Sequence, residues 1–479
     1  MATPDLSNNY DRFKIPPSAE ESRKPPKDFS TMDRAPRKRA SKPELLAPGG
    51  SLEKLRIAFL YGADAVYASG KDFGLRGFAR NLDTEELAAA SVISHRLGKR
   101  LYVTVNIFAR EPDLKKLPAY LEYLGELGVD ALIISDPGVL ALARKYAPEI
   151  PLHLSTQANT TNSSSVDFWH EQGVCRINLA RELSLAEIAG IAGKSKAEIE
   201  VFVHGAMCMS YSGRCLMSAF LNLPGSPPQK GGEKGVVRPG LLGGWDRSAN
   251  GGFCTQPCRW SWGLVEEKRP GEVFPVEEDR RGTYIFNSKD LCLIEDIGEL
   301  ARAGVDSFKI EGRMKGPLYL ASVTRAYRHA IDLRADRRDA CKVEPAWLED
   351  LEKVSHRPYT KGNLYGNFQD CDANVETRIS YVQTHTLAGL VRAWPDCDFP
   401  AEEDHKADGR VFMEVRSKLV PGMRLEFLNP DGSSSFHLLD SFEDVNGNRL
   451  ARAHPNSFIR FRTDFRVFPL EAVRVARQD

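Results

Sequence analysis

Short β-rich runs alternate with helical patterns from residue 44 to residue 311, and this alternation constrains the fold more than any other feature. Eight runs have strand character, at residues 44–48, 65–68, 101–106, 131–135, 152–155, 176–179, 200–204 and 307–311. Strands that alternate with helices along a chain usually form a parallel sheet. Eight such units predict an α/β fold whose main domain, residues 43–335, is a (β/α)8 barrel of the TIM type.

Two local patterns bear on this prediction. Ser184 and Glu187 have capping-box spacing, in which each side chain satisfies a backbone amide of the other, so a helix should begin there. A ninth β-rich run, residues 283–287, exceeds the count of eight. It is either the penultimate barrel strand or an added hairpin.

Composition outside the barrel predicts three further regions. Residues 1–42 are rich in proline and basic side chains and should form a disordered tail, and residues 223–252 form a Gly/Pro-rich insertion. Residues 336–373 read as a linker with helical character. From residue 374 to 479, alternating runs and the turn signal at 429–432 predict a small antiparallel β-barrel domain.

Charge and hydropathy place limits on the class of protein. The 479 residues include 65 Lys+Arg and 65 Asp+Glu, so the net charge is zero and any site for a polyanion must be local. No run of eighteen apolar residues and no apolar N-terminal segment is present, which predicts neither a membrane span nor a secretory signal. We therefore expect a cytoplasmic protein.

Four of the nine cysteines form two pairs around the Gly/Pro-rich insertion. Cys208 and Cys215 follow the predicted strand at 200–204, and Cys254 and Cys258 lie in a Gly-flanked loop. Four thiolates are the set that a cubane iron–sulfur cluster or a structural zinc requires, and unrelated core cysteines are a third possibility. The other five cysteines should be small buried residues: Cys175, Cys292, Cys341, Cys371 and Cys397.

The stretch from Glu200 to Ser218, EVFVHGAMCMSYSGRCLMS, resembles the signature of the collagenase-like peptidase family U32. Further blocks occur in the family's order, at residues 44–49, 62–67, 153–159, 287–291 and 309–313. The resemblance covers most of residues 43–335, and the β-rich tail resembles the family's C-terminal domain. It is greatest to members that install 5-hydroxyuridine at the tRNA wobble position without molecular oxygen, in a prephenate-dependent way. Related members hydroxylate a ribosomal RNA cytidine or the ubiquinone ring.

The resemblance implies a cofactor, a co-substrate and a set of site residues. Cys208, Cys215, Cys254 and Cys258 would hold an iron–sulfur cluster of the 4Fe–4S type, and tRNA would be the macromolecular partner. Lys309, Glu311 and Arg313 alternate along one strand, so they should share its face at the barrel rim. Lys309 and Arg313 could there hold the dicarboxylate prephenate, although an internal salt bridge of Lys309 and Glu311 with a neighbour is an equal alternative.

The remaining candidates are His153, Gln157 and Asn159, which the resemblance suggests orient the substrate or reach the base edge. Their alternative role is a hydrogen-bond network that closes the strand end. The acid, the base and the source of the hydroxyl oxygen are not assigned by any pattern in the sequence.

Two other functions stay open on the sequence. A peptidase could pair a cysteine nucleophile with His153 or His204, but four clustered cysteines exceed what one nucleophile needs, and no metalloprotease or serine-hydrolase motif occurs. A non-catalytic RNA-binding factor could use the basic residues Arg313 and Lys315 and the aromatic and basic residues of 458–465. The latter segment could equally be a strand with one aromatic core face.

Overall fold

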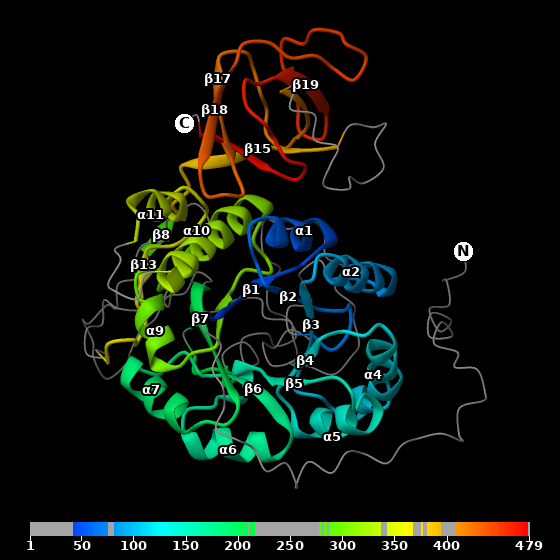
Figure 1. Cartoon of the computed structure of the whole chain (residues 1–479), viewed down its shortest axis with the longest axis vertical. Helices are drawn as coiled ribbons and strands as arrows, with labels where there is room; N and C mark the ends of the chain where they lie inside the picture. Colours follow the sequence, from blue (N-terminus) through cyan, green and yellow to red (C-terminus); the bar gives the residue numbers. More distant parts are fainter. Residues whose placement is uncertain are drawn as a thin grey trace, which may run out of the picture.

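A computed structural model shows eight parallel strands closed into a barrel, which confirms the predicted TIM-like architecture. It describes residues 42–74, 81–208, 210–215, 277–279, 282–284, 287–336, 343–366, 375–376, 381–393 and 409–477. Strands β1 to β7 pair in chain order, and β12 pairs with both β7 and β1 to close the ring (Figure 1). The strands are β1 (Glu44–Pro48), β2 (Ala65–Ala68), β3 (Arg100–Val105), β4 (Ala131–Ile134), β5 (Leu152–Leu154), β6 (Val174–Asn178), β7 (Glu198–Ala206) and β12 (Ser307–Ile310).

Helices surround this ring on its outside (Figure 1). They are α1 (Leu52–Leu60), α2 (Thr84–Arg96), α3 (Glu111–Leu114), α4 (Leu117–Glu126), α5 (Pro137–Tyr146), α6 (Ser163–Glu171), α7 (Leu185–Lys194), α9 (Ile297–Ala303) and α10 (Pro317–Asp336). Helix α7 begins at the predicted capping box, since the Glu187 amide donates to Ser184 Oγ and the Ser184 amide donates to Glu187 Oε2. The hydrophobic core lies between strands and helices, where outward-facing residues such as Val66, Val103 and Ile177 are buried.

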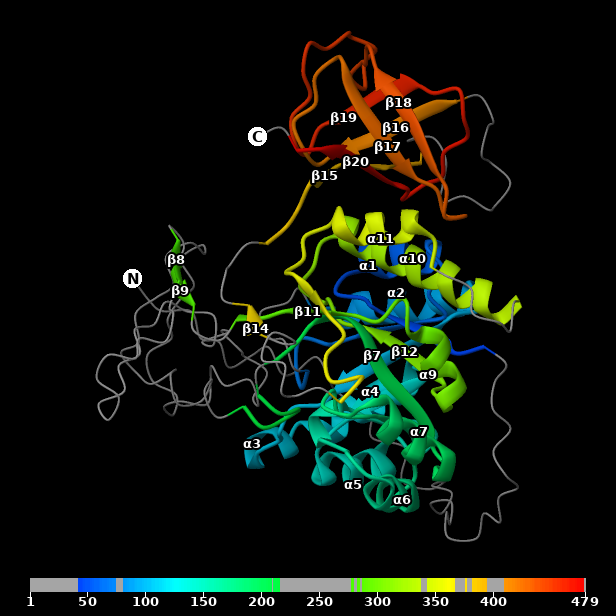
Figure 2. The same cartoon turned by 90° about the vertical axis from the view of Figure 1, so that its left-hand side faces the viewer.

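Additional strands extend the sheet beyond the barrel. Strand β11 (Asp290–Cys292) pairs antiparallel with the long strand β7, and β13 (Tyr359–Thr360) continues the sheet after helix α11 (Pro345–Glu352). The ninth β-rich run is not a barrel strand: its first residues belong to an added hairpin of β8 (Glu277–Asp279) and β9 (Gly282–Tyr284). Figure 2 shows this hairpin on the side of the barrel where α3 follows the end of β3. A short pair, β10 (Asn287–Ser288) and β14 (Val375–Glu376), lies near it.

The C-terminal domain is a curled antiparallel sheet of six strands in the order β18-β17-β20-β15-β16-β19. Its strands are β15 (His385–Val391), β16 (Arg410–Val415), β17 (Met423–Leu428), β18 (Ser434–Leu439), β19 (Phe458–Arg462) and β20 (Ala472–Ala476). Within the part of the chain that is described, no ladder joins edge strands β18 and β19. Their side chains nevertheless meet inside the curl, where the rings of His437 and Phe461 stack at 5.3 Å.

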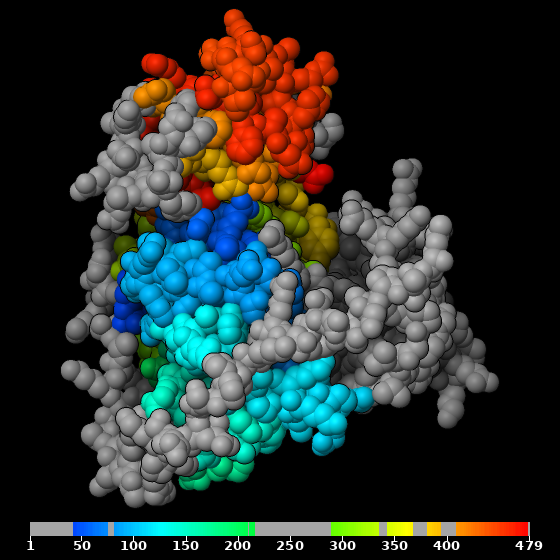
Figure 3. Space-filling model, turned by 90° about the vertical axis from the view of Figure 1, so that its right-hand side faces the viewer, coloured from blue at the N-terminus to red at the C-terminus, as the bar shows by residue number. Residues whose placement is uncertain are grey.

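This domain packs on the flank of the barrel, against α1, α10 and α11 (Figures 1 and 3). The Tyr61 hydroxyl, just after α1, donates to the Leu428 carbonyl at 2.7 Å and accepts from the Ala472 amide at 2.9 Å. Arg474 of β20 forms an ion pair with Asp350 of α11 at 2.6 Å. The barrel mouth is therefore not the surface to which this domain is attached.

Several predictions fall on parts of the chain that the structure does not describe. These are the N-terminal tail, apart from residue 42, and the Gly/Pro-rich insertion at 223–252. Over the described ranges, no helix combines the length and the apolar character needed to cross a membrane.

Candidate functional site

The first cysteine pair lies at the C-terminal end of β7, on a segment that we call the cysteine loop, residues 207–215, of which residue 209 is not described. Cys208 is exposed, Cys215 is half-buried, and neither is in a disulfide. Active sites of TIM barrels lie at this end of the strands. Cys254 and Cys258, the predicted second pair, lie outside the described residues.

Contacts with the ends of β5 and β6 fix the path of the cysteine loop. The Ser212 amide and hydroxyl both donate to the Glu182 carboxylate, at 2.6 and 3.1 Å. Gly213 has φ +72°, and a Cβ there would lie 2.0 Å from the Gln157 carbonyl oxygen. Only glycine permits both this backbone conformation and this close approach. The loop therefore rests directly on the turn that follows β5.

That turn carries two predicted site residues. Gln157 belongs to a single 3-10 turn, η3 (Thr156–Ala158), and Asn159 ends it in the left-handed conformation with φ 54°. The Asn159 side-chain oxygen is buried without a hydrogen-bond partner. Gln157 and Asn159 thus lie at the end of β5, beside the cysteine loop. Their role in binding the substrate stays a prediction.

Consecutive strands contribute a set of buried polar residues that we call the polar arc: Asn106 after β3, Ser135 after β4, Ser155 after β5 and Asn178 at the end of β6. Asn106 donates through Nδ2 to Ser155 Oγ at 3.1 Å, and the Ser135 hydroxyl donates to the Asn106 carbonyl at 2.9 Å. The strand ends are therefore polar on the inside of the barrel, beside the cysteine loop.

His153 lies deeper than its neighbours Gln157 and Asn159. Its ring meets the ring of Tyr102 edge-on at 4.7 Å inside the barrel. Burial, with the positive charges of Arg176 and Lys309, holds the pKa of His153 well below its ordinary range. The imidazole is consequently neutral at physiological pH, and its Nδ1 has no hydrogen-bond partner.

The position of Lys309 shows that residues 309, 311 and 313 do not all lie at the barrel rim, contrary to the prediction. Its side chain is 4% exposed and points into the barrel, where Nζ lies 2.8 Å from Glu200 Oε1. The internal salt bridge was therefore the right alternative, but with Glu200 as the partner in place of Glu311. Because one carboxylate already compensates this ammonium group, Lys309 is not an available cation for a dicarboxylate.

Arg313 occupies a different position because β12 ends at Ile310, and Gly312 then turns the backbone with φ +149°. The guanidinium is 4% exposed and donates through Nη1 to Thr104 Oγ1 at 3.2 Å. Thr104 is the fifth residue of the six-residue strand β3, so this contact places Arg313 over the upper barrel. Because Arg313 lies beyond the end of β12, the alternation of side chains along a strand does not determine which way it points.

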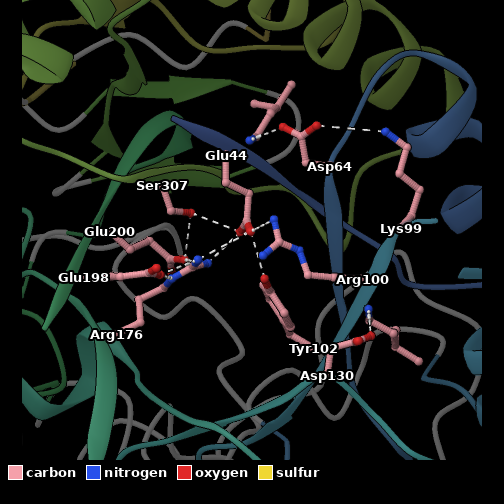
Figure 4. A network of polar contacts seen from close by, with 12 residues as sticks. Glu44, Asp64, Lys99, Arg100, Tyr102, Asp130, Arg176, Glu198, Glu200 and Ser307 are labelled. Atoms are coloured by element: carbon pink, nitrogen blue, oxygen red, sulfur yellow. Dashed lines mark hydrogen bonds and ion pairs between the residues drawn. The ribbon is translucent and has the colours of Figure 1, made fainter. Parts of the chain in front are cut away.

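Lys309 belongs to a set of paired charges that sequence reasoning missed, of which Glu44, Arg176, Glu200 and Lys309 are buried. We call it the barrel ion network, and its members are Glu44, Arg100, Arg176, Glu198, Glu200 and Lys309. Figure 4 shows all of these residues except Lys309. Arg176 lies at its centre, 2.5 Å from Glu44, 2.6 Å from Glu198 and 3.7 Å from Glu200. Three cations face three anions, and the four buried members, Glu44, Arg176, Glu200 and Lys309, balance in charge among themselves. The sequence signal that could have predicted this network is the occurrence of charged residues at alternating positions of otherwise apolar strands.

Two further cysteines are described outside the cysteine loop, one buried and one exposed. Cys292 in β11 is buried, as expected, and burial raises the pKa of its thiol to about 11, so it stays protonated. Cys175 in β6 is exposed, which corrects its prediction as a buried residue. Cys341, Cys371 and Cys397 lie outside the described residues.

The two histidines proposed for a cysteine peptidase are both buried. His204 contacts Tyr327, whose hydroxyl lies 3.3 Å from its Nδ1, and burial lowers the pKa of His204 to about 3. The Tyr327 hydroxyl also lies 3.9 Å from Cys292 Sγ, but that thiol is the protonated one described above. No contact between a histidine and Cys208 is found among the described residues. These geometries give a peptidase no activated nucleophile there.

In the C-terminal domain, the aromatic residues of β19 divide between two faces. Phe461 packs inside the sheet near Phe427, as a core strand requires, whereas Phe458 is 39% exposed and stacks on Phe412. Arg462 is exposed as well. The segment is thus a strand with an aromatic core face, and its outer face is mixed.

Comparison with known proteins gives two family matches. Residues 50–374 match the model described as peptidase family U32, and residues 395–474 match its C-terminal domain. The first match includes β2 to β7, β12 and the cysteine loop.

Curated relatives extend over most of the chain. It is 34% identical to tRNA hydroxylation protein P1 of Bacillus subtilis, over 93% of this chain and 98% of that protein. It is 36% identical to tRNA hydroxylation protein P of Escherichia coli, over 85% of this chain and 91% of the relative. It is also 35% identical to the 23S rRNA 5-hydroxycytidine C2501 synthase of Escherichia coli, over 66% of this chain and 44% of that enzyme.

Proposed function

The chain belongs to peptidase family U32, and we propose that within this family it is an RNA hydroxylase that forms 5-hydroxyuridine at the wobble position of tRNA. Two relatives that match most of its length are named tRNA hydroxylation proteins, and a third is named a ribosomal RNA 5-hydroxycytidine synthase. The observation that carries the proposal is the cysteine loop, which rests on the polar strand ends at the barrel mouth. A tRNA substrate would put the reaction in the cytoplasm.

We further propose that Cys208 and Cys215, together with Cys254 and Cys258, hold a 4Fe–4S cluster. The fit is supported by the two described thiols, which lie on one loop at the mouth and outside any disulfide, Cys208 exposed and Cys215 half-buried. Thiolates are the ligands that such clusters take from proteins, and a bound cluster would supply one-electron chemistry. Between the two cysteines, the Ser212 amide and hydroxyl donate to the Glu182 carboxylate, and Gly213 lies against the Gln157 carbonyl.

Prephenate is the co-substrate we propose, with Arg313 as its carboxylate contact. A guanidinium matches a carboxylate with two parallel hydrogen bonds, and Arg313 reaches over the upper barrel toward Thr104. Lys309 has no part in this proposal because Glu200 compensates its charge inside the barrel.

The experiment that tests the function is nucleoside mass spectrometry of total tRNA from cells that lack the protein. We expect 5-hydroxyuridine and its derivatives to disappear and to return when the intact gene is restored. An unchanged nucleoside profile would overturn the proposed function. Peptide release from casein or collagen by cluster-free protein would instead support a peptidase.

A further inference from the structure

Asn178, at the end of β6, points into the barrel beside the polar residues of the mouth. It is the register partner of Glu200 in the parallel ladder with β7, and partners in such a ladder face the same side. Arg176, two residues earlier, also points inward, into the barrel ion network. Asn178 is 1% exposed, yet neither its Oδ1 nor its Nδ2 has a hydrogen-bond partner.

The other residues of the polar arc have hydrogen-bond partners, unlike Asn178. Asn106, Ser135 and Ser155 are joined to one another by the hydrogen bonds given above. A buried polar group without a partner costs about 1–3 kcal/mol, and native proteins nearly always pair such groups with protein, water or ligand. Within the described residues, both halves of the Asn178 amide are therefore open to a further hydrogen-bond partner.

Other unpartnered atoms lie in the same sector of the barrel. They are Nδ1 of His153 in β5, and the side-chain oxygens of Asn159 and Thr160 in the segment that follows β5. This is the sector on which the cysteine loop rests, through the contact of Gly213 with Gln157. These three atoms belong to β5 and the segment after it, beside Asn178 on the neighbouring strand β6, although other unpartnered atoms of the described residues, such as Nε2 of His204 in β7, lie elsewhere in the barrel.

We propose that Asn178 recognises the Watson–Crick edge of the target pyrimidine, an inference that rests on the proposed RNA hydroxylation. A primary amide offers one acceptor and one donor side by side in a plane. In uracil, N3–H can donate to Oδ1 while a flanking carbonyl accepts from Nδ2, so both unpartnered atoms are satisfied. Cytosine offers the same pair with the amide turned over, so the class of ligand is a pyrimidine base.

A carboxylate co-substrate fits this position less well. Its oxygens only accept hydrogen bonds, so they would satisfy Nδ2 and leave Oδ1 unpaired and facing a negative charge. Enzymes that modify a base also take it out of the stack and read its hydrogen-bonding edge in a pocket. A base held by Asn178 would lie next to the cysteine loop, where the modification is proposed to occur.

Replacing Asn178 distinguishes a role in base recognition from a role in the stability of the fold. In Asn178→Leu, a near-isosteric apolar side chain removes two unpaired buried atoms, so we expect the melting temperature to stay equal or rise. The level of 5-hydroxyuridine in tRNA from cells with this variant as their only copy should fall about tenfold or more. The matched control Asn106→Leu breaks the hydrogen bond to Ser155 and should lower the melting temperature. A normal level of 5-hydroxyuridine with Asn178→Leu would overturn the inference.

A modified substrate tests the contact itself. We would measure the binding of the purified holoprotein to an anticodon stem–loop that carries uridine or 3-methyluridine at the target position. The methyl group removes the N3–H donor, so it should weaken binding to the wild type about tenfold, and it should weaken binding to Asn178→Leu hardly at all. Equal penalties in both proteins would overturn the contact. If wild-type cells make no 5-hydroxyuridine, the proposed function fails first, and this inference with it.

Discussion

Cys208 and Cys292 lie at the same pair of strands, β7 and β11, yet their thiols differ in chemistry. Cys292 is the register partner of His204 and is enclosed by the core, where burial raises the pKa of its thiol. Cys208 comes just after β7 and is exposed at the mouth. Cluster ligation requires thiolates, so the environment of Cys208 suits it and that of Cys292 does not.

The first prediction concerns Cys208. We expect Cys208→Ser to lower bound iron and sulfide in the purified protein by more than half and to abolish 5-hydroxyuridine in tRNA, because one of four thiolate ligands is lost. Iron, acid-labile sulfide and visible absorbance are the measurements. Cys175→Ser, which changes an exposed cysteine of β6 away from the mouth, should leave all three unchanged. Full iron content in Cys208→Ser would contradict the ligand assignment.

Lys309 and Arg313 show where residue-level prediction stopped. The sequence placed both on one face of one strand, since it offered no sign that β12 ends at Ile310. Two other strands supply the groups that stabilise this buried lysine: Glu200 on β7 as its counter-ion, and Tyr67 on β2 as a ring 4.8 Å from Nζ. Such partners are far apart in the chain and meet only in the closed barrel.

At the scale of elements, the cysteine loop and the turn η3 act as a unit. Gly213 approaches the Gln157 carbonyl too closely for any side chain, and Ser212 is tied to Glu182 beyond β6. The ends of β5, β6 and β7 are thereby joined at the mouth. The position of the two cysteines depends on this junction more than on β7 alone.

The second prediction tests that junction. Gly213→Ala would put a Cβ 2.0 Å from the Gln157 oxygen on backbone with φ +72°, so the loop must move. We expect loss of most bound iron and at least a tenfold drop in 5-hydroxyuridine, with a melting temperature within a few degrees of wild type because the barrel core is untouched. Gly128→Ala is the matched control. Its φ is +64°, but no atom lies within 4 Å of the added Cβ, so iron content should not change.

The element pattern itself was well predicted from sequence, and the reason is local. Most barrel strands are short runs of largely apolar residues, and several helices have a start signal of their own, as at Ser184. Strands β11 and β13 were not foreseen, because they have three and two residues and pair only through contact with β7 and with each other. Runs so short carry no periodicity.

For the whole molecule, the interface between barrel and C-terminal domain contains a buried carboxyl group with unusual properties. Glu471 is fully buried next to Ala472, whose amide donates to Tyr61 of the barrel. The Phe468 amide donates to Glu471 Oε2 at 2.9 Å, while Oε1 has no partner. Burial raises the pKa of Glu471 to about 8, so this group is mostly protonated at neutral pH in the folded protein.

The third prediction follows from this pKa. The ordinary pKa of a glutamate, 4.5, applies to the unfolded chain, and in the fold the pKa of Glu471 is about 8. Below pH 4.5 both states are protonated. Between these values only the unfolded chain releases the proton, so the free energy of unfolding falls as pH rises and levels off above pH 8. Glu471→Gln keeps a neutral group and should remove a loss on the order of 3 kcal/mol between pH 5 and pH 8.

Chemical denaturation of wild type and Glu471→Gln across that pH range is the measurement, with the exposed residue change Glu349→Gln as the control. The difference in unfolding free energy between wild type and Glu471→Gln should widen steadily with pH. The difference for Glu349→Gln should stay flat. Parallel pH profiles of wild type and Glu471→Gln would show that Glu471 ionises normally in the fold.

The sequence by itself determined the order and type of the elements, the (β/α)8 architecture and the location of the first cysteine pair at the end of a strand. These depend on periodicity, caps and turns, which act over a few residues. Only the tertiary structure decided that Lys309 is a member of the barrel ion network, that Arg313 lies over the mouth, and that Asn178 is left without partners among the described residues. Burial and pairing of polar groups are properties of the closed barrel, because their partners come from strands up to 263 residues apart, as for Glu44 and Ser307.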